Sequence, residues 1–315
     1  MNRKALIVGI KGIALSRHEV LFLKKQKPWG VILFSRNIES LDQLKKLVDK
    51  IKYIFKDKNY PILIDQEGGR VSRLNKIIDF TIFSQGFFSN LYKKDKFFFN
   101  TNFRIYVDLV CQIMNYVGIN INTIPVLDVL RKNSHSIIGD RSFSSNPDLV
   151  SKMGNIYIKS FNMNKIATVT KHIPGHGLSK SDSHKKLQSI NIEKNKLISI
   201  DFKPFKKCKS YFSMTAHIIY KAYDPNFTAT HSKIIVRKVI RKIIGFKGIL
   251  ISDDISMKSL KYGLTNNALM ALDAGCNIVL HCNGNIREMW KLSKVIPNID
   301  IFTQKKTSQF YKFLG

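Results

Sequence analysis

Cysteine is scarce in this sequence, and no two cysteines are spaced as C-x-x-C. The four residues are Cys111, Cys208, Cys276 and Cys282, scattered over 315 positions. A chain of this length can bury a full hydrophobic core without disulfide bonds. We therefore expect reduced, mostly buried thiols.

The sequence also lacks a long apolar run. The apolar stretch at residues 5–10 is shorter than the hydrophobic region of a signal peptide and meets Lys11 at once. No other stretch approaches the roughly 20 apolar residues that a membrane-spanning helix needs. These absences predict a cytoplasmic protein without membrane insertion.

Acidic residues are few, with 22 Asp and Glu against 52 Lys and Arg, a formal net charge of +30. Such an excess is typical of proteins that bind nucleic acid or an anionic membrane surface. Here the lysines are spread along the chain among many Ile and Asn residues, without a nucleic-acid motif. We interpret the charge as biased residue usage on solvated helix faces and expect no nucleic-acid partner. A nucleic-acid-binding protein remains an alternative, which requires binding that falls steeply with salt.

Short β-forming apolar runs alternate with amphipathic segments from end to end. This alternation predicts the α/β class and a parallel sheet, and eight runs fit a (β/α)8 TIM-type barrel formed by residues 1–315 as a single domain. The eight predicted strands are Ala5–Ile10, Trp29–Phe34, Pro61–Asp65, Asn120–Val129, Ala167–His172, Tyr211–His217, Gly248–Asp253 and Cys276–His281.

Several helix ends can also be predicted. Ser40 and Gln43 form a capping box, and Asn146 followed by Pro147 marks a helix start. Gly245 closes a helix whose residues 235, 239 and 243 share one face. The Phe- and Lys-rich stretch 75–102 has no clean period, so we expect a long loop or a short helical piece there.

Titratable residues stand where the predicted strands end. In a (β/α)8 barrel these positions meet at the C-terminal face, where active sites lie. A shared polar pocket would satisfy side chains that are costly to bury singly. Asp254 should point away from Asp253, because successive strand residues alternate. The strand-end residues are Asp65, Asp128, Lys171, His172, His217, Asp253 and Asp254.

The segment ILIDQEGGRVSRL adds arginines and two glycines after the third strand. Gly68 and Gly69 allow a tight turn or a close approach of the backbone to a ligand. Arg70 has two interpretations, a ligand contact or an ion pair with Glu67 or Asp65, and the same choice applies to Arg141 in IIGDRSF.

The segment TKHIPGHGLSKSDSH concentrates His172, His176, Asp182 and His184. Asp182 could orient the ring of His184 and raise its basicity. A metal-dependent barrel hydrolase using His172, His176 and His184 with Asp253 is the alternative. We prefer a site without metal or other cofactor, because the sequence has neither HxH at a strand end nor HExxH on a helix. Asp253 beside a His/Asp pair suffices for covalent catalysis at a sugar carbon.

Six motifs in this order, DQEGGRVSR, IPVLDV, IGDRSF, KHIPGHG with DSH, MTAHIIY and ISDDISM, resemble those of glycoside hydrolase family 3, specifically its bacterial β-N-acetylhexosaminidases. The resemblance covers roughly residues 5–285. It implies a single-domain barrel, expected to be monomeric, that works without a cofactor. The implied reaction removes terminal β-linked GlcNAc, with retention, from peptidoglycan-derived substrates in cell-wall recycling. These substrates are the disaccharide GlcNAc-1,6-anhydro-MurNAc and its muropeptides.

The resemblance also implies roles for individual residues. Asp253 resembles the nucleophile, and His184 resembles the acid/base with Asp182 as its partner. The matching substrate-binding positions are Asp65, Arg73, Arg141, Lys171 and His172.

The sequence departs from the family pattern at three places. Ile173 stands where Phe is common, and the loop reads LSKS before Asp182, so we expect a reshaped wall near the sugar. The stretch 75–102 also differs, which bears on the outer substrate subsites.

Overall fold

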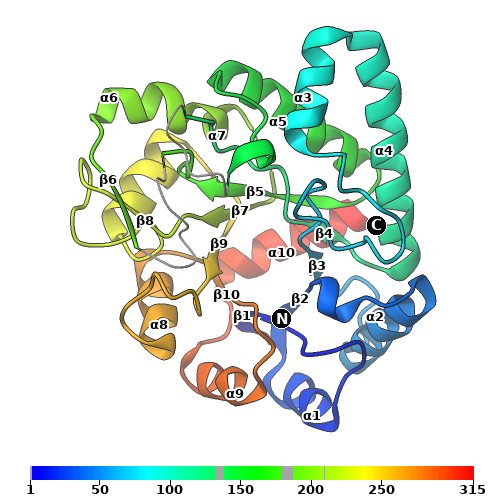
Figure 1. Cartoon of the computed structure of the whole chain (residues 1–315). Helices are drawn as coiled ribbons and strands as arrows, with labels where there is room; N and C mark the ends of the chain where they lie inside the picture. The colour runs from blue at the N-terminus through cyan, green and yellow to red at the C-terminus, as the bar shows by residue number, and fades with distance from the viewer. Residues whose placement is uncertain (1, 132–137, 179–186, 209) are drawn as a thin grey trace.

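Eight parallel strands close into a barrel in the computed structural model, which describes residues 2–131, 138–178, 187–208 and 210–315 (Figure 1). The predicted (β/α)8 barrel is confirmed, and each predicted run overlaps one barrel strand. The strands are β1 (Lys4–Gly9), β2 (Pro28–Leu33), β3 (Ile62–Ile64), β4 (Ile121–Asn122), β5 (Ala167–Ile173), β7 (Phe212–Thr215), β9 (Ile249–Asp254) and β10 (Ile278–His281). Around the barrel their order is β1, β10, β9, β7, β5, β4, β3, β2.

Helices surround this ring, as Figure 1 shows. The longer ones are α1 (Arg17–Gln26), α2 (Leu41–Phe55), α3 (Gln85–Lys94), α4 (Lys96–Val117), α5 (Pro147–Met163), η4 (Ile235–Ile243), α8 (Leu264–Ala274), α9 (Ile286–Val295) and α10 (Ile301–Leu314). Short turns are η1 (Ser35–Asn37), η2 (Gly139–Arg141), α6 (Lys194–Lys196), η3 (Leu197–Asp201) and α7 (Lys203–Lys207), and β6 (Gln188–Ile190) pairs with β8 (Ile218–Tyr220) outside the barrel. No helix within the described ranges combines the length and apolarity needed to cross a membrane.

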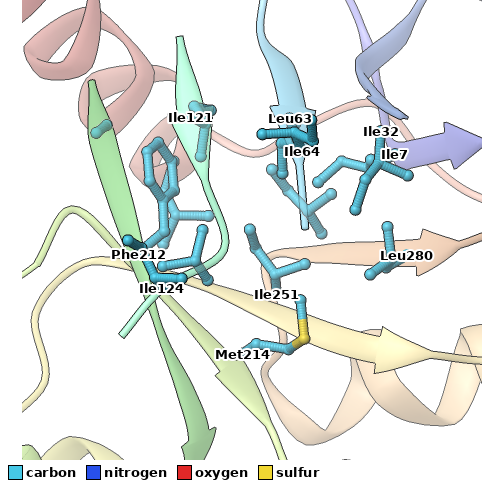
Figure 2. Close-up of a cluster of buried hydrophobic side chains, with 14 of the residues drawn as sticks. Ile7, Ile32, Leu63, Ile64, Ile121, Ile124, Phe212, Met214, Ile251 and Leu280 are labelled. Atoms are coloured by element: carbon cyan, nitrogen blue, oxygen red, sulfur yellow. The ribbon is translucent and has the colours of Figure 1, made fainter. Parts of the chain in front are cut away.

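Apolar side chains fill the barrel between its strands. Figure 2 shows them together, and all are buried: Ile7, Ile32, Leu63, Ile64, Ile121, Ile124, Phe212, Met214, Ile251 and Leu280. Burying such branched side chains stabilises the fold by roughly 1.5–3 kcal/mol each. A packed interior of this kind confines any ligand to the loops at the barrel ends.

Helix α10 crosses the N-terminal opening of the barrel, and in Figure 1 it lies across the middle of the ring of strands. Trp29 Nε1 donates a hydrogen bond to Thr307 Oγ1 at 2.9 Å, and the rings of Phe310 and Phe212 meet edge-on at 5.3 Å. Helix α10 does not cover the opposite opening, where the strands end, so a ligand-binding site can form there.

Two helix starts behave as predicted, with one difference. Asn146 accepts hydrogen bonds from the N–H groups of Asp148 and Leu149, with Pro147 in the first turn. Ser40 caps α2 by accepting from Gln43 N, but Gln43 Oε1 accepts from Glu39 N at 2.8 Å and not from Ser40, so the predicted capping box is only half formed.

The prediction for residues 75–102 holds only in part, because residues 75–84 form no regular helix or strand but the rest is more helical than expected. Residues 85–94 and 96–117 form α3 and α4, a hairpin whose buried Phe88, Phe99 and Phe103 pack on one another. Exposed Phe97 and Phe98 add apolar residues outside this buried face, and they obscure the helical period in the sequence.

Strand β4 is also shorter than the predicted run 120–129. Only Ile121 and Asn122 pair regularly with β3 and β5. Pro125 has no N–H to donate, so the regular ladder stops before it and the chain continues with isolated contacts such as Leu127 N to Lys171 O.

Candidate active site

A cavity of about 380 Å³ opens at the C-terminal ends of the barrel strands. Asp253 and all five predicted substrate-binding residues, which come from the segments at the ends of β3, β4, β5 and β9, contribute to its wall. The lining residues are Ile32, Phe34, Asp65, Arg70, Val71, Arg73, Thr123, Arg141, Lys171, His172, Met214, Asp253, Asp254, Leu280 and Cys282. Charged groups thus form one side of a pocket whose floor is the apolar barrel interior.

Four of these residues, Asp65, Arg73, Arg141 and Lys171, belong to one network of ion pairs. Glu67 completes the network, because it pairs with both Lys171 and Arg141. Asp65 follows β3, and its carboxylate lies 2.7 Å from Arg73 Nη2 and 2.6 Å from Lys171 Nζ. Lys171 Nζ also lies 2.5 Å from Glu67 Oε1. Arg141 then grips Glu67 with two donors, at 2.7 and 2.8 Å. The network holds three cations and two anions in fixed positions.

Burial would by itself destabilise every charge in this network, but the partners outweigh it. Burial raises the pKa of Asp65, yet Lys171 and Arg73 hold it well below the ordinary value. For Glu67, Arg141 and Lys171 likewise overcome burial and lower the pKa. Burial lowers the pKa of Lys171, and the two carboxylates raise it above the ordinary value. Asp65, Glu67 and Lys171 therefore stay charged near neutral pH and do not exchange protons there.

The role of Glu67 was not predicted from the sequence, where Glu67 was named only as a possible ion-pair partner of Arg70. Its side chain is buried, and its partners Arg141 and Lys171 follow it by 74 and 104 residues, so local spacing carries no sign of them. Arg70 instead faces Asp140, at 3.9 Å. Of the two predicted interpretations of Arg141, the ion pair is observed, while the residue still lines the cavity.

The turn at Gly68 and Gly69 shapes this wall. Both have positive φ, 82° and 59°. A Cβ on Gly68 would lie 2.2 Å from Phe83 O, so the close approach that needs glycine is to the protein's own backbone.

His172 is fixed by Asp128, another predicted strand-end residue. Its Nδ1 lies 2.8 Å from Asp128 Oδ2, which leaves Nε2 as the nitrogen available to a ligand. Asp128 Oδ1 also accepts from the backbone N–H groups of His172 and His176. Burial opposes ionisation of Asp128, but His172 and these hydrogen bonds lower its pKa to about 2. Burial and the nearby His172 lower the pKa of His176 to about 4, so His176 is neutral at pH 7.

Strand β9 delivers both Asp253 and Asp254 to the wall of the cavity. Asp254 N donates to Asp253 Oδ1 at 2.8 Å, and Asp254 accepts from Ser256 N and Oγ and from Cys282 N. The carboxylate of Asp254 is thus held by the turn after β9 and by the residue that follows β10.

His217 supports this turn from behind. Its Nε2 lies 3.0 Å from Asp254 O, and since a carbonyl only accepts, Nε2 carries the proton. Burial lowers the pKa of His217, so the ring is neutral and its Nδ1 accepts from Thr230 Oγ1 at 2.7 Å. Thr230 in turn lies 2.8 Å from Thr215 Oγ1. A chain of neutral groups therefore fixes the backbone beside Asp253.

Two predicted catalytic residues, Asp182 and His184, lie outside the described residues. The metal alternative needs His184 as well. Among the residues that the structure describes, no three His, Cys, Asp or Glu side chains are arranged to hold a metal ion. Ile173 is buried and does not itself line the cavity.

The four cysteines are free thiols, as predicted. Three are buried, and Cys282 is partly buried at the cavity.

Comparisons with known proteins agree with this geometry. Residues 6–310 match the glycosyl hydrolase family 3 N-terminal domain. A β-hexosaminidase from Alkalilimnicola ehrlichii is 35% identical over 286 residues, covering 88% of this chain and 80% of that protein. One from Idiomarina loihiensis is 31% identical, covering 93% and 88%. The crystal structure of NagZ from Neisseria gonorrhoeae in complex with N-trifluoroacetyl-D-glucosamine superimposes with a TM-score of 0.86 at 27% identity, covering 100% of this chain and 90% of that one.

Proposed function

Because this chain belongs to glycosyl hydrolase family 3, we propose that it is a retaining β-N-acetylhexosaminidase of cell-wall recycling. Like its β-hexosaminidase relatives, it is a glycosidase that hydrolyses N-acetylglucosamine linkages. The proposed substrates are peptidoglycan fragments with a terminal non-reducing β-linked GlcNAc, namely GlcNAc-1,6-anhydro-MurNAc and its peptides. We further infer that the enzyme acts in the cytoplasm as a single-domain monomer.

One observation carries the proposal: Asp253 shares a cavity with a wall of charges held in place before any ligand binds. The volume, about 380 Å³, lies within the range of roughly 300–1,000 Å³ typical of small-molecule sites. Donors already fixed by ion pairs need no reorganisation when they grip sugar hydroxyls or an N-acetyl group. In this role we propose Asp65, Arg73, Arg141, Lys171 and His172.

In the proposed reaction, an Asp253 carboxylate oxygen attacks the anomeric carbon and forms a glycosyl-enzyme bond. The bond to the leaving oxygen breaks, and His184, oriented by Asp182, protonates that oxygen. Water then attacks the same carbon, His184 takes its proton, and the bond to Asp253 breaks with its electrons returning to the carboxylate. Two displacements retain the β configuration.

The first test compares two adjacent carboxylates with a chromogenic GlcNAc β-glycoside. Asp253→Asn should reduce kcat by at least about 10³-fold, because the nucleophile is lost. Asp254→Asn is the matched control and should lose far less. Equal turnover by wild type and Asp253→Asn would end the proposal. Loss of wild-type activity in a chelator would instead favour the metal-dependent alternative.

The covalent intermediate and the substrate need separate measurements. A slowly reacting fluorinated GlcNAc analogue should label Asp253, as located by mass spectrometry, and a label on another residue contradicts the assignment. Hydrolysis of GlcNAc-1,6-anhydro-MurNAc should exceed that of a chitin disaccharide in kcat/KM. The reverse preference would contradict the cell-wall substrate while leaving the glycosidase intact.

A further inference from the structure

A second concave surface lies at the opposite end of the barrel, where strands begin. It consists of two cavities of about 470 and 600 Å³ that share Phe246, Lys247, Lys306 and Gln309, and we call it the basal groove. Its wall includes the residues that immediately precede three strands: Tyr211 before β7, Gly248 before β9 and Asn277 before β10. It is therefore separated from the proposed active site by the packed barrel interior.

Arg241 stands in this groove as a cation held by neutral atoms. Its Nη1 donates to Phe246 O at 3.0 Å and to Gly248 O at 2.8 Å, and its Nη2 donates to Asn277 Oδ1 at 2.8 Å. The rings of Phe246 and Phe302 lie 5.4 and 5.7 Å from the guanidinium carbon. These contacts fix the guanidinium in place without neutralising it.

Arg3, at the same end of the barrel, shows the contrast. Its Nη2 lies 2.5 Å from Asp57 Oδ2, and its Nη1 donates to Tyr311. Burial lowers the pKa of both arginines, but Tyr311, Tyr60 and Asp57 raise that of Arg3 overall, whereas that of Arg241 stays below the ordinary value. The charge of Arg241 is therefore incompletely compensated within the protein.

The other charges of the groove are almost all positive. Lys206, Lys247, Lys305 and Lys306 line it, and Asp300 is the one carboxylate on its wall within the described residues. Asp300 Oδ1 caps α10 by accepting from Thr303 N. In the described part of the chain, no carboxylate lies within 4.0 Å of Arg241 or of these lysines.

We propose that the basal groove binds a small molecule bearing at least two phosphoryl groups. Beside its three hydrogen bonds, the Arg241 guanidinium keeps Nε–H and one Nη2–H as donors for phosphoryl oxygens, and the flanking ammonium groups add point charges. The partly exposed ring of Phe302 provides apolar surface for the organic part of such a ligand. This site is independent of the glycosidase activity and would exist without it.

Isothermal titration of the full chain with inorganic pyrophosphate, at about 0.1 M salt to screen exposed charges, tests the proposal. Wild type should show saturable binding at one site. The double variant Lys247→Gln/Lys305→Gln should weaken this binding at least tenfold, because both lysines are exposed on the groove. The matched control Lys24→Gln/Lys25→Gln removes the same charge from exposed positions on α1 and should bind as wild type does.

The absence of saturable binding would overturn the proposal, and so would an equal loss in the α1 control or equal affinity for citrate, which carries comparable charge without phosphorus. Tight binding of single-stranded RNA with none of pyrophosphate would also overturn it. Arg241→Gln should abolish binding, and unchanged hydrolysis by the double lysine variant verifies that it is folded.

Discussion

The two ends of the barrel treat positive charge in opposite ways. At the C-terminal end, Lys171 and Arg141 are buried against the carboxylates of Asp65 and Glu67. At the N-terminal end, Arg241 is held by carbonyl and amide oxygens and by aromatic rings. The first arrangement makes a rigid polar wall beside the proposed nucleophile, and the second leaves charge that a ligand can still neutralise. Hydrogen bonds to neutral oxygens fix the position of the Arg241 guanidinium, but only a nearby carboxylate would neutralise its electric field.

The largest effect is expected from removing the anion shared by two buried cations. Glu67→Gln leaves Arg141 without its carboxylate partner and Lys171 with Asp65 alone, and it should lower the free energy of unfolding by roughly 3–5 kcal/mol. Urea unfolding measures this change. Asp49→Asn, which breaks the exposed Lys45–Asp49 pair, is the control and should change nothing resolvable. A Glu67→Gln variant as stable as the control would show that the cations at the C-terminal end do not depend on a buried carboxylate.

The next effect concerns the neutral support behind Asp253. His217→Leu removes the hydrogen bonds to Asp254 O and Thr230 and should reduce kcat on the order of tenfold to a hundredfold, because the nucleophile shifts. KM should change little, since His217 does not line the cavity. His217→Gln keeps an N–H for Asp254 O and should recover much of kcat. Equal losses in both variants, or a loss confined to KM, would contradict a positioning role.

The C-terminal end of the barrel should also differ from the N-terminal end in how its contribution to stability depends on pH. Asp128 has a folded pKa of about 2 against an ordinary value of 3.8, so its stabilising contribution is complete above pH 3.8 and is lost as pH falls through 2. This contribution is roughly 2 kcal/mol. In urea unfolding at several pH values, the stability advantage of wild type over Asp128→Asn should shrink between pH 4 and pH 2. A constant difference would mean that Asp128 contributes through hydrogen bonds alone.

The smallest change in stability is expected at the N-terminal end of the barrel, where Arg241 lies. Arg241→Gln should cost roughly 1 kcal/mol, because hydrogen bonds to neutral oxygens are lost and no buried anion is left behind. Arg3→Gln should cost more, since it strips Asp57 of its guanidinium. Thermal or urea unfolding of the two variants under one condition measures the order, and its reversal would erase the contrast between Arg3 and Arg241.

Much of the fold could be predicted because parallel strands buried on both faces appear as continuous apolar runs, such as ILI in β3 and the first residues of β9. Because parallel strands end at one face of a barrel, Asp65, Lys171 and Asp253 were predicted to lie at the same end, and the structure brings them to one cavity. Predictions failed where tertiary contacts decide the outcome. Helices α3 and α4 depend on packing between their aromatic residues, and the role of Glu67 depends on partners far along the chain.

The basal groove is a further case that sequence could not predict. Its residues come from positions between 205 and 309, and they meet only because three strands start at the same level and α10 passes beneath them. In the sequence, Arg241 is one more basic residue among 52. Only its neutral partners distinguish it.

The pairing of β1 with β10 sets an order on biosynthesis. Leu6 lies opposite Val279, so one edge of the first strand has no neighbour until about 280 residues have left the ribosome. During that time the nascent chain carries an open sheet edge and unburied isoleucines, the features that recruit chaperones and promote self-association. The speed at which the final quarter of the message is translated therefore bears on how much active protein a cell obtains.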